Sequence, residues 1–93
     1  MDAARAIADY VLALEHAADT TARAEDRPGY TALLAHAAPL LAAALSTEAA
    51  QDLSTRLQQH ERLWGSLWLS DPASQEASMA WQAAKAACHH VGV

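Results

Sequence analysis

The chain has 93 residues, enough for a single domain, and carries a formal net charge of −5. Twenty-five positions are alanine, whereas Leu, Ile and Val together supply only 16 and there is no Phe. The single cysteine, Cys88, excludes an intrachain disulfide, and six scattered bases give no basic face for nucleic acid or an anionic membrane. These features predict one helical domain over residues 1–93, soluble and by default cytoplasmic.

The first predicted helix runs from Asp2 or Ala3 to Arg27. Its apolar residues recur at steps of three and four, which is the spacing of one buried helix face. Pro28 and Gly29 are expected to end this helix, because proline disfavours a helical residue before it and glycine permits a left-handed turn.

The second predicted helix begins with Thr31 as its N-cap and runs to Leu45. Its only polar interior side chain is His36, so we expect this helix to be the most buried of the fold. Pro39 lies inside it and predicts a kink near residues 35–38. The alternative is two short helices, the second opened by Pro39.

The third predicted helix starts at Ser46 or Thr47 and ends near Leu69. Its apolar stripe contains Leu53, Leu57, His60 and Trp64, among others. Gly65 is either a flaw in the helix, costing about 1 kcal/mol against alanine, or a point where another backbone approaches closely.

The fourth predicted helix has Asp71 as N-cap and Pro72 at its first position, an arrangement that favours a helix start. Its buried stripe includes Trp81 and Cys88. Four helices with short connections predict an all-α fold, a compact antiparallel bundle in which the Pro39-kinked second helix is central.

The five histidines raise the question of a metal site. His60-Glu61 resembles the start of the zinc-binding motif H-E-x-x-H, but Trp64 stands at the second histidine position and cannot bind zinc. Cys88, His89 and His90 are adjacent on a helix, so their side chains diverge by about 100° per residue. We therefore expect no metal site and no cofactor.

His36 and His60 differ from the other histidines because both lie on apolar stripes. A histidine in such a place is usually a core residue with a ring nitrogen bonded to a neighbour. The alternative hypothesis is that His36 or His60 lines a pocket in the bundle and binds haem, a metal or a small molecule.

Two other classes of function have weaker support. Phosphotransfer domains are acidic helical bundles of similar size, but the lysine and glycine that closely follow their histidine do not follow His16 or His36. Residues 41–57 have helix-turn-helix spacing, yet Glu48 and Asp52 would face the DNA phosphates.

No nucleophile, base and orienting residue are spaced as a catalytic set, so we do not expect an enzyme. Tryptophans are common in interface hot spots and hard to bury fully in a short chain. The leading hypothesis is therefore a protein-interaction module, with a homodimer favoured over another protein partner, and a surface formed by Trp64, Trp68, Leu69 and Trp81. The longest apolar run, residues 32–45, is too short to span a bilayer, so no membrane contact is expected.

Overall fold

The computed structural model describes residues 3–45, 50–67, 69 and 72–89. Its helices are α1 (Ala3–Thr20), α2 (Arg27–Leu45), α3 (Ala50–Ser66) and α4 (Pro72–His89), with a short 3-10 helix, η1 (Ala24–Asp26), between the first two. The described residues include no strand. The all-α class and the presence of four helices are therefore confirmed.

The end of α1 differs from the prediction, because this helix stops at Thr20 and not at Arg27. The backbone becomes extended at Arg23, and α2 begins at Arg27. The Arg27 Nε then donates to the Ala18 carbonyl oxygen at 3.2 Å, which satisfies an end carbonyl of α1.

Pro28 and Gly29 consequently open a helix and do not close one. Proline is tolerated in the first turn of a helix, where its missing N–H would have had no partner. Thr31 is likewise inside α2 and is not its N-cap, since its hydroxyl donates to the Arg27 carbonyl oxygen at 3.0 Å.

Helix α2 continues through Pro39, so the alternative of two short helices is wrong. Pro39 and Ala35 are both exposed, and the Ala35 carbonyl oxygen that loses its hydrogen bond to Pro39 lies on the water side of the helix. The expected kink near residues 35–38 stays a prediction.

The expectation that the second helix is the most buried is wrong. Seven residues of α1 are buried, against five of α2, although α2 is one residue longer. Helix α1 packs against α2 and α4, and α2 packs against α1 and α3, but the outer side of α2 is covered by no described element.

Helix α4 starts at Pro72, as predicted. Helix α3 ends at Ser66, three residues before the predicted end at Leu69. The predicted N-caps Ser46, Thr47 and Asp71 lie outside the described residues.

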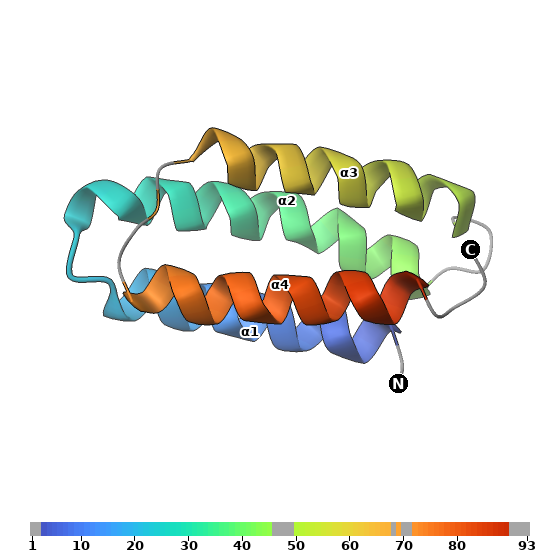
Figure 1. Ribbon diagram of the computed structural model, residues 1–93, viewed down its shortest axis with the longest axis horizontal. Coiled ribbons are helices and arrows are strands. Elements are labelled where there is room, and N and C mark those ends of the chain that lie inside the picture. The colour runs from blue at the N-terminus through green and yellow to red at the C-terminus, as the bar shows by residue number, and fades with distance from the viewer. Residues whose placement is uncertain (1–2, 46–49, 68, 70–71, 90–93) are drawn as a thin grey trace.

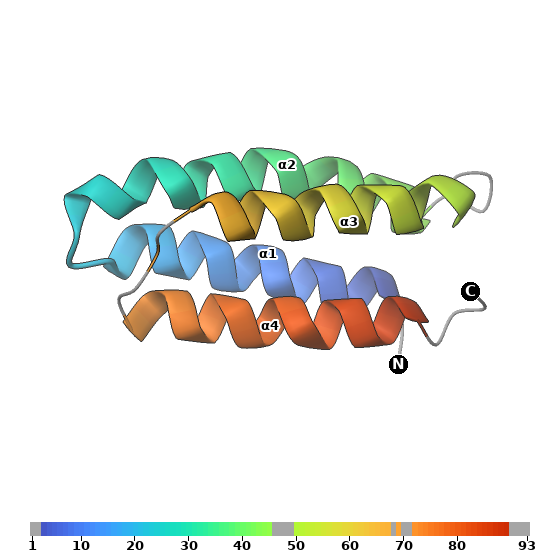
Figure 2. The same ribbon diagram turned by 45° about the horizontal axis from the view of Figure 1, so that its top comes forward.

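The helices lie along the long axis of a molecule with extents of 39 × 22 × 17 Å, α1 beside α4 and α2 beside α3 (Figures 1 and 2). Among the described residues, the fully buried apolar core comes from α1, α2 and α4 alone, and its largest members are Ile7, Tyr10, Leu14, Tyr30, Leu33, Leu40, Trp81 and Cys88. Helix α3 adds half-buried side chains around this core and one fully buried residue, His60.

Candidate functional site

The centre of the molecule holds a hydrogen-bonded chain of side chains from three helices, which we call the relay: Trp64, Tyr10, His60 and His36. The Trp64 Nε1–H of α3 donates to the Tyr10 hydroxyl of α1 at 2.7 Å. The same hydroxyl lies 2.5 Å from Nε2 of His60. The Nδ1 atoms of His60 and His36 are 2.9 Å apart, which extends the chain to α2.

One arrangement of the hydrogens leaves none of the Trp64 N–H, the Tyr10 hydroxyl and the His60 N–H without an acceptor. An indole N–H only donates, so the Tyr10 oxygen accepts from Trp64 and its own hydrogen goes to Nε2 of His60. His60 therefore carries its hydrogen on Nδ1 and donates it to Nδ1 of His36. The remaining N–H of His36 is on Nε2, and the relay runs in one direction from Trp64 to His36.

Burial keeps the middle of the relay uncharged. Burial, with a smaller contribution from the nearby His36, lowers the pKa of His60 from 6.5 to about 4, although the charge of Glu61 acts in the opposite direction. Burial also raises the pKa of Tyr10 well above its ordinary value. Both groups are therefore neutral at pH 7, as the direction of the hydrogen bonds requires.

The rings of the relay pack against one another and against Trp81 of α4. His60 and Trp81 have ring centroids 4.6 Å apart, and Tyr10 meets the edge of His60 at 5.4 Å. Because each ring is held by neighbours on several helices, the hydrogen-bonding atoms have little freedom to rotate away.

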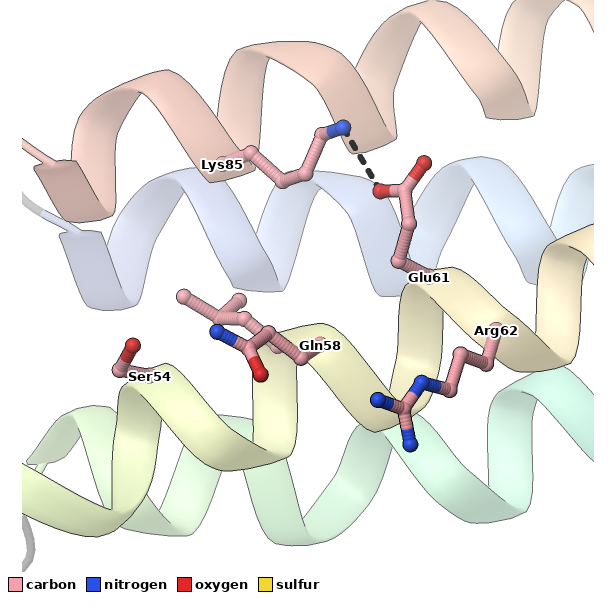
Figure 3. Close-up of a pocket in the computed structure, with 6 residues that line it drawn as sticks. Ser54, Gln58, Glu61, Arg62 and Lys85 are labelled. Atoms are coloured by element: carbon pink, nitrogen blue, oxygen red, sulfur yellow. Dashed lines mark ion pairs between the residues drawn. The ribbon is translucent and has the colours of Figure 1, made fainter.

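A second polar connection ties α3 to α4 through one carboxylate oxygen. Oε2 of Glu61 accepts from Trp81 Nε1 at 2.7 Å and lies 2.6 Å from Nζ of Lys85. The hydrogen bond with Lys85 lowers the pKa of Glu61, so this carboxylate is ionised at pH 7. Figure 3 shows Lys85 reaching from α4 toward Glu61 across the gap between the helices.

This gap is a groove of about 410 Å³, whose remaining lining residues are Ser54, Leu57, Gln58 and Arg62. In Figure 3 the Arg62 side chain extends away from the Glu61–Lys85 pair. The charged groups of the groove therefore do not converge on one point, and Glu61 is already bonded to protein groups.

The two histidines singled out from the sequence, His36 and His60, lie in direct contact. Both ring nitrogens of His60 have a partner in the protein, so neither is free to bind haem iron or another metal. Within the described ranges, no three His, Cys, Asp or Glu side chains are placed to hold a metal ion together. For a ligand-binding role, the structure leaves only Nε2 of the half-buried His36.

The tryptophans predicted as an interaction surface occupy different environments. Trp81 is 1% exposed and belongs to the core, so its assignment to a surface is corrected. Trp64 is half-buried with its N–H used by Tyr10, and Leu69 is half-buried near Gly29. Trp68 lies outside the described residues. The physical reason is the polar core. Tyr10 and Glu61 accept the indole N–H groups, so these donors keep a partner when the rings are buried.

Sequence reasoning missed Tyr10, Glu61 and Lys85 as members of the polar centre. The available signal was the Tyr10 hydroxyl within an apolar stripe, because a buried hydroxyl requires a partner. The identity of that partner depends on how the helices are placed against each other, and the relay joins residues 24 to 54 positions apart in the chain.

The outer face of α2 is the other unusual surface. It consists of exposed Ala32, Ala35, Ala38, Pro39, Ala42 and Leu45, flanked by half-buried Leu34 and Leu41. No residue from Pro28 to Leu45 is charged, and Leu45 is 70% exposed. The other three helices present charged side chains to water, such as Asp9 on α1, Arg56 on α3 and Glu76 on α4.

The segment Ala24–Leu45 has 22 residues and a mean hydropathy of 1.3 in its most apolar window. By length and composition alone it could cross a membrane, which the shorter apolar run considered in the sequence analysis could not. Core helices of soluble proteins meet the same criterion, so this is weak evidence for a membrane. Comparison of the chain with protein-family models, with curated proteins and with solved structures gives no match.

Proposed function

We propose that this chain is a small, non-catalytic helical interaction module that binds a second copy of itself through the outer face of α2. The observation that supports this proposal is that two thirds of the most apolar helical segment is not buried within its own chain. A soluble helix normally turns charged residues to water, and an uncharged exposed helix face is typical of an interaction site.

The spacing of residues along one edge of this face suits another helix. The half-buried Leu34 and Leu41 at its border and the exposed Ala38 and Leu45 follow each other at steps of four, three and four, which is the pattern of a coiled-coil seam. The alanines beside them permit two helix axes to approach to about 8 Å, the lower end of the usual range.

A second copy is the partner that fits this face best. The chain has a net charge of −5, so two copies repel each other over most of their surfaces. The outer face of α2 is where two copies meet without bringing charges together. A two-fold axis would then place the same apolar residues opposite each other.

The interior of the molecule favours binding over catalysis. The relay uses its hydrogen bonds within the protein, and burial raises the pKa of the Cys88 thiol, which makes it a poor nucleophile. We therefore propose no catalytic residue, no cofactor and no nucleic-acid partner, and a cytoplasmic location in keeping with the single buried cysteine.

Native mass spectrometry at micromolar concentration tests the proposal, with Ala38→Glu as the variant. Ala38 is exposed, so glutamate fits the monomer but places two charges in the dimer contact. The expected result is a dimer for the wild-type chain and a monomer for Ala38→Glu, with unchanged helix content by circular dichroism.

The matched control is Ala83→Glu, the same substitution at an exposed position of α4, which should leave the dimer intact. A wild-type monomer at high concentration, or equal weakening by both variants, would contradict the proposal. A monomer carrying added mass would favour ligand binding at His36 in its place.

A further inference from the structure

Helix α3 is attached to the rest of the molecule in a different way from the other helices. Among the described residues, the fully buried apolar core is built from α1, α2 and α4, and α3 adds only half-buried apolar side chains to it. Among the described residues of α3, the one that is fully buried is His60. Helix α3 is therefore held by these half-buried apolar contacts together with the polar bonds of His60, Trp64 and Glu61.

The hydrogen bonds that run from Tyr10 to His36 cannot all be kept when one more proton is added to either histidine. If His36 takes a proton on Nδ1, two N–H groups face each other across the 2.9 Å contact with His60. If His60 takes it on Nε2, the Tyr10 hydroxyl accepts from both Trp64 and His60, and its own hydrogen loses its acceptor. Tyr10 is fully buried, so no water replaces that acceptor.

We propose that protonation releases helix α3. Uptake of one proton by the His36–His60 pair breaks the relay and frees α3 from the α1–α2–α4 core in mildly acidic solution. The core that remains keeps its own apolar contacts, because none of its fully buried members belongs to the described part of α3.

The groups around His60 offset the new charge only in part, through the carboxylate of Glu61. Tyr10 from α1, His36 from α2 and Trp81 from α4 surround the ring, and none of them carries a negative charge. The nearby carboxylate is Glu61 of α3, and it is already paired with Lys85 of α4 and bonded to Trp81. A proton on the pair is therefore a largely uncompensated charge in a dry site.

Linkage gives the size and sign of the effect. His60 has a pKa of about 4 when α3 is docked and 6.5 when it is exposed, so its contribution to docking is complete above pH 6.5 and is lost as the pH falls toward 4. Between pH 7 and pH 5 the equilibrium constant for opening should rise about twentyfold.

Amide hydrogen exchange of the intact chain, followed residue by residue by NMR, tests the proposal. After correction for intrinsic exchange rates, we expect the opening constant of α3 amides to rise about twentyfold from pH 7 to pH 5. At each pH the amides of α1 and α4 should have smaller opening constants than those of α3, because they are exposed only when the whole chain unfolds.

The matched variants are His60→Gln and His16→Gln. Glutamine at position 60 can accept from Tyr10 and donate to His36 but does not titrate, so the pH dependence of α3 should disappear. His16 is exposed on α1, and its replacement should leave the wild-type response. If His60→Gln does not fold, His60→Leu is a second variant that cannot titrate at this position, and it should also abolish the response.

Three results would overturn the proposal. The first is a pH-independent opening constant for α3 in the wild-type chain. The second is an equal opening constant in α1, α3 and α4 at every pH, which would show that the whole molecule opens at once. The third is a wild-type response that persists in a folded variant lacking the titrating histidine.

Discussion

At the scale of single residues, the Tyr10 hydroxyl determines the direction of the hydrogen bonds in the polar centre. Its oxygen is the one atom of the relay that accepts and donates at the same time, from Trp64 and to His60. Its position on α1 therefore determines the tautomer of a histidine on α3 and, through that histidine, the tautomer of His36 on α2.

Tyr10→Phe should lower the free energy of unfolding by about 1–3 kcal/mol, because it leaves the Trp64 N–H without an acceptor and His60 Nε2 without a donor. Urea denaturation at pH 7 measures this change. The same substitution in a His60→Leu background should cost less, since one partner of the hydroxyl is already absent. Equal costs in both backgrounds would show that Tyr10 and His60 act independently.

The contact between His36 and His60 could not be predicted from the sequence. Each histidine was predicted to be either a bonded core residue or a pocket ligand, and the structure shows hydrogen bonds for both. The apolar stripe indicates that a side chain points inward. It does not indicate which residue of another helix lies at the same level along the helix axes.

At the scale of the helices, the periodic apolar pattern predicts four elements because it depends only on local spacing. Pro28 and Gly29 show where this reasoning fails. The same pair of residues can follow one helix or open the next, and the choice depends on Arg27 reaching the Ala18 carbonyl oxygen across the turn. Such a contact has no local sequence signature.

Gly65→Ala should stabilise the chain by about 0.5–1 kcal/mol, because alanine is the better helix former. No described atom lies within 4 Å of the added Cβ, which supports the first of the two sequence interpretations of this glycine. Urea denaturation measures the gain.

Gly29→Ala is the comparison within α2, where the added Cβ would lie 3.2 Å from Leu69 Cδ2. This contact is tight, so the gain there should be smaller than at Gly65. A Gly65→Ala variant less stable than the wild-type chain would show that space at this position is needed.

At the scale of the whole molecule, stability should decrease in acid. The pKa of His60 is lowered by burial, so its contribution is present above pH 6.5 and is lost as the pH falls toward 4. The pKa of Glu61 is lowered by Lys85, so its contribution is present above 4.5 and is lost as the pH falls through the lowered value. Both groups change stability in the same direction, His60 first.

The free energy of unfolding should therefore fall by about 2 kcal/mol between pH 7 and pH 5, nearly all of it from His60. A series of urea denaturation curves over this range measures the decrease. The His60→Gln series should be nearly flat down to pH 5. A wild-type series as flat as that of the variant would contradict the assignment of the decrease to His60.

Because the hydrogen bonds of the relay run in one direction, they also restrict which substitutions can accumulate at its four positions during evolution. A single replacement at Tyr10, His36, His60 or Trp64 leaves a buried donor or acceptor alone, whereas joint replacement of bonded partners by apolar residues of similar shape can be almost neutral. The four positions are therefore expected to be inherited as a set. A descendant that has lost one member of the set should have lost its neighbours in the relay as well.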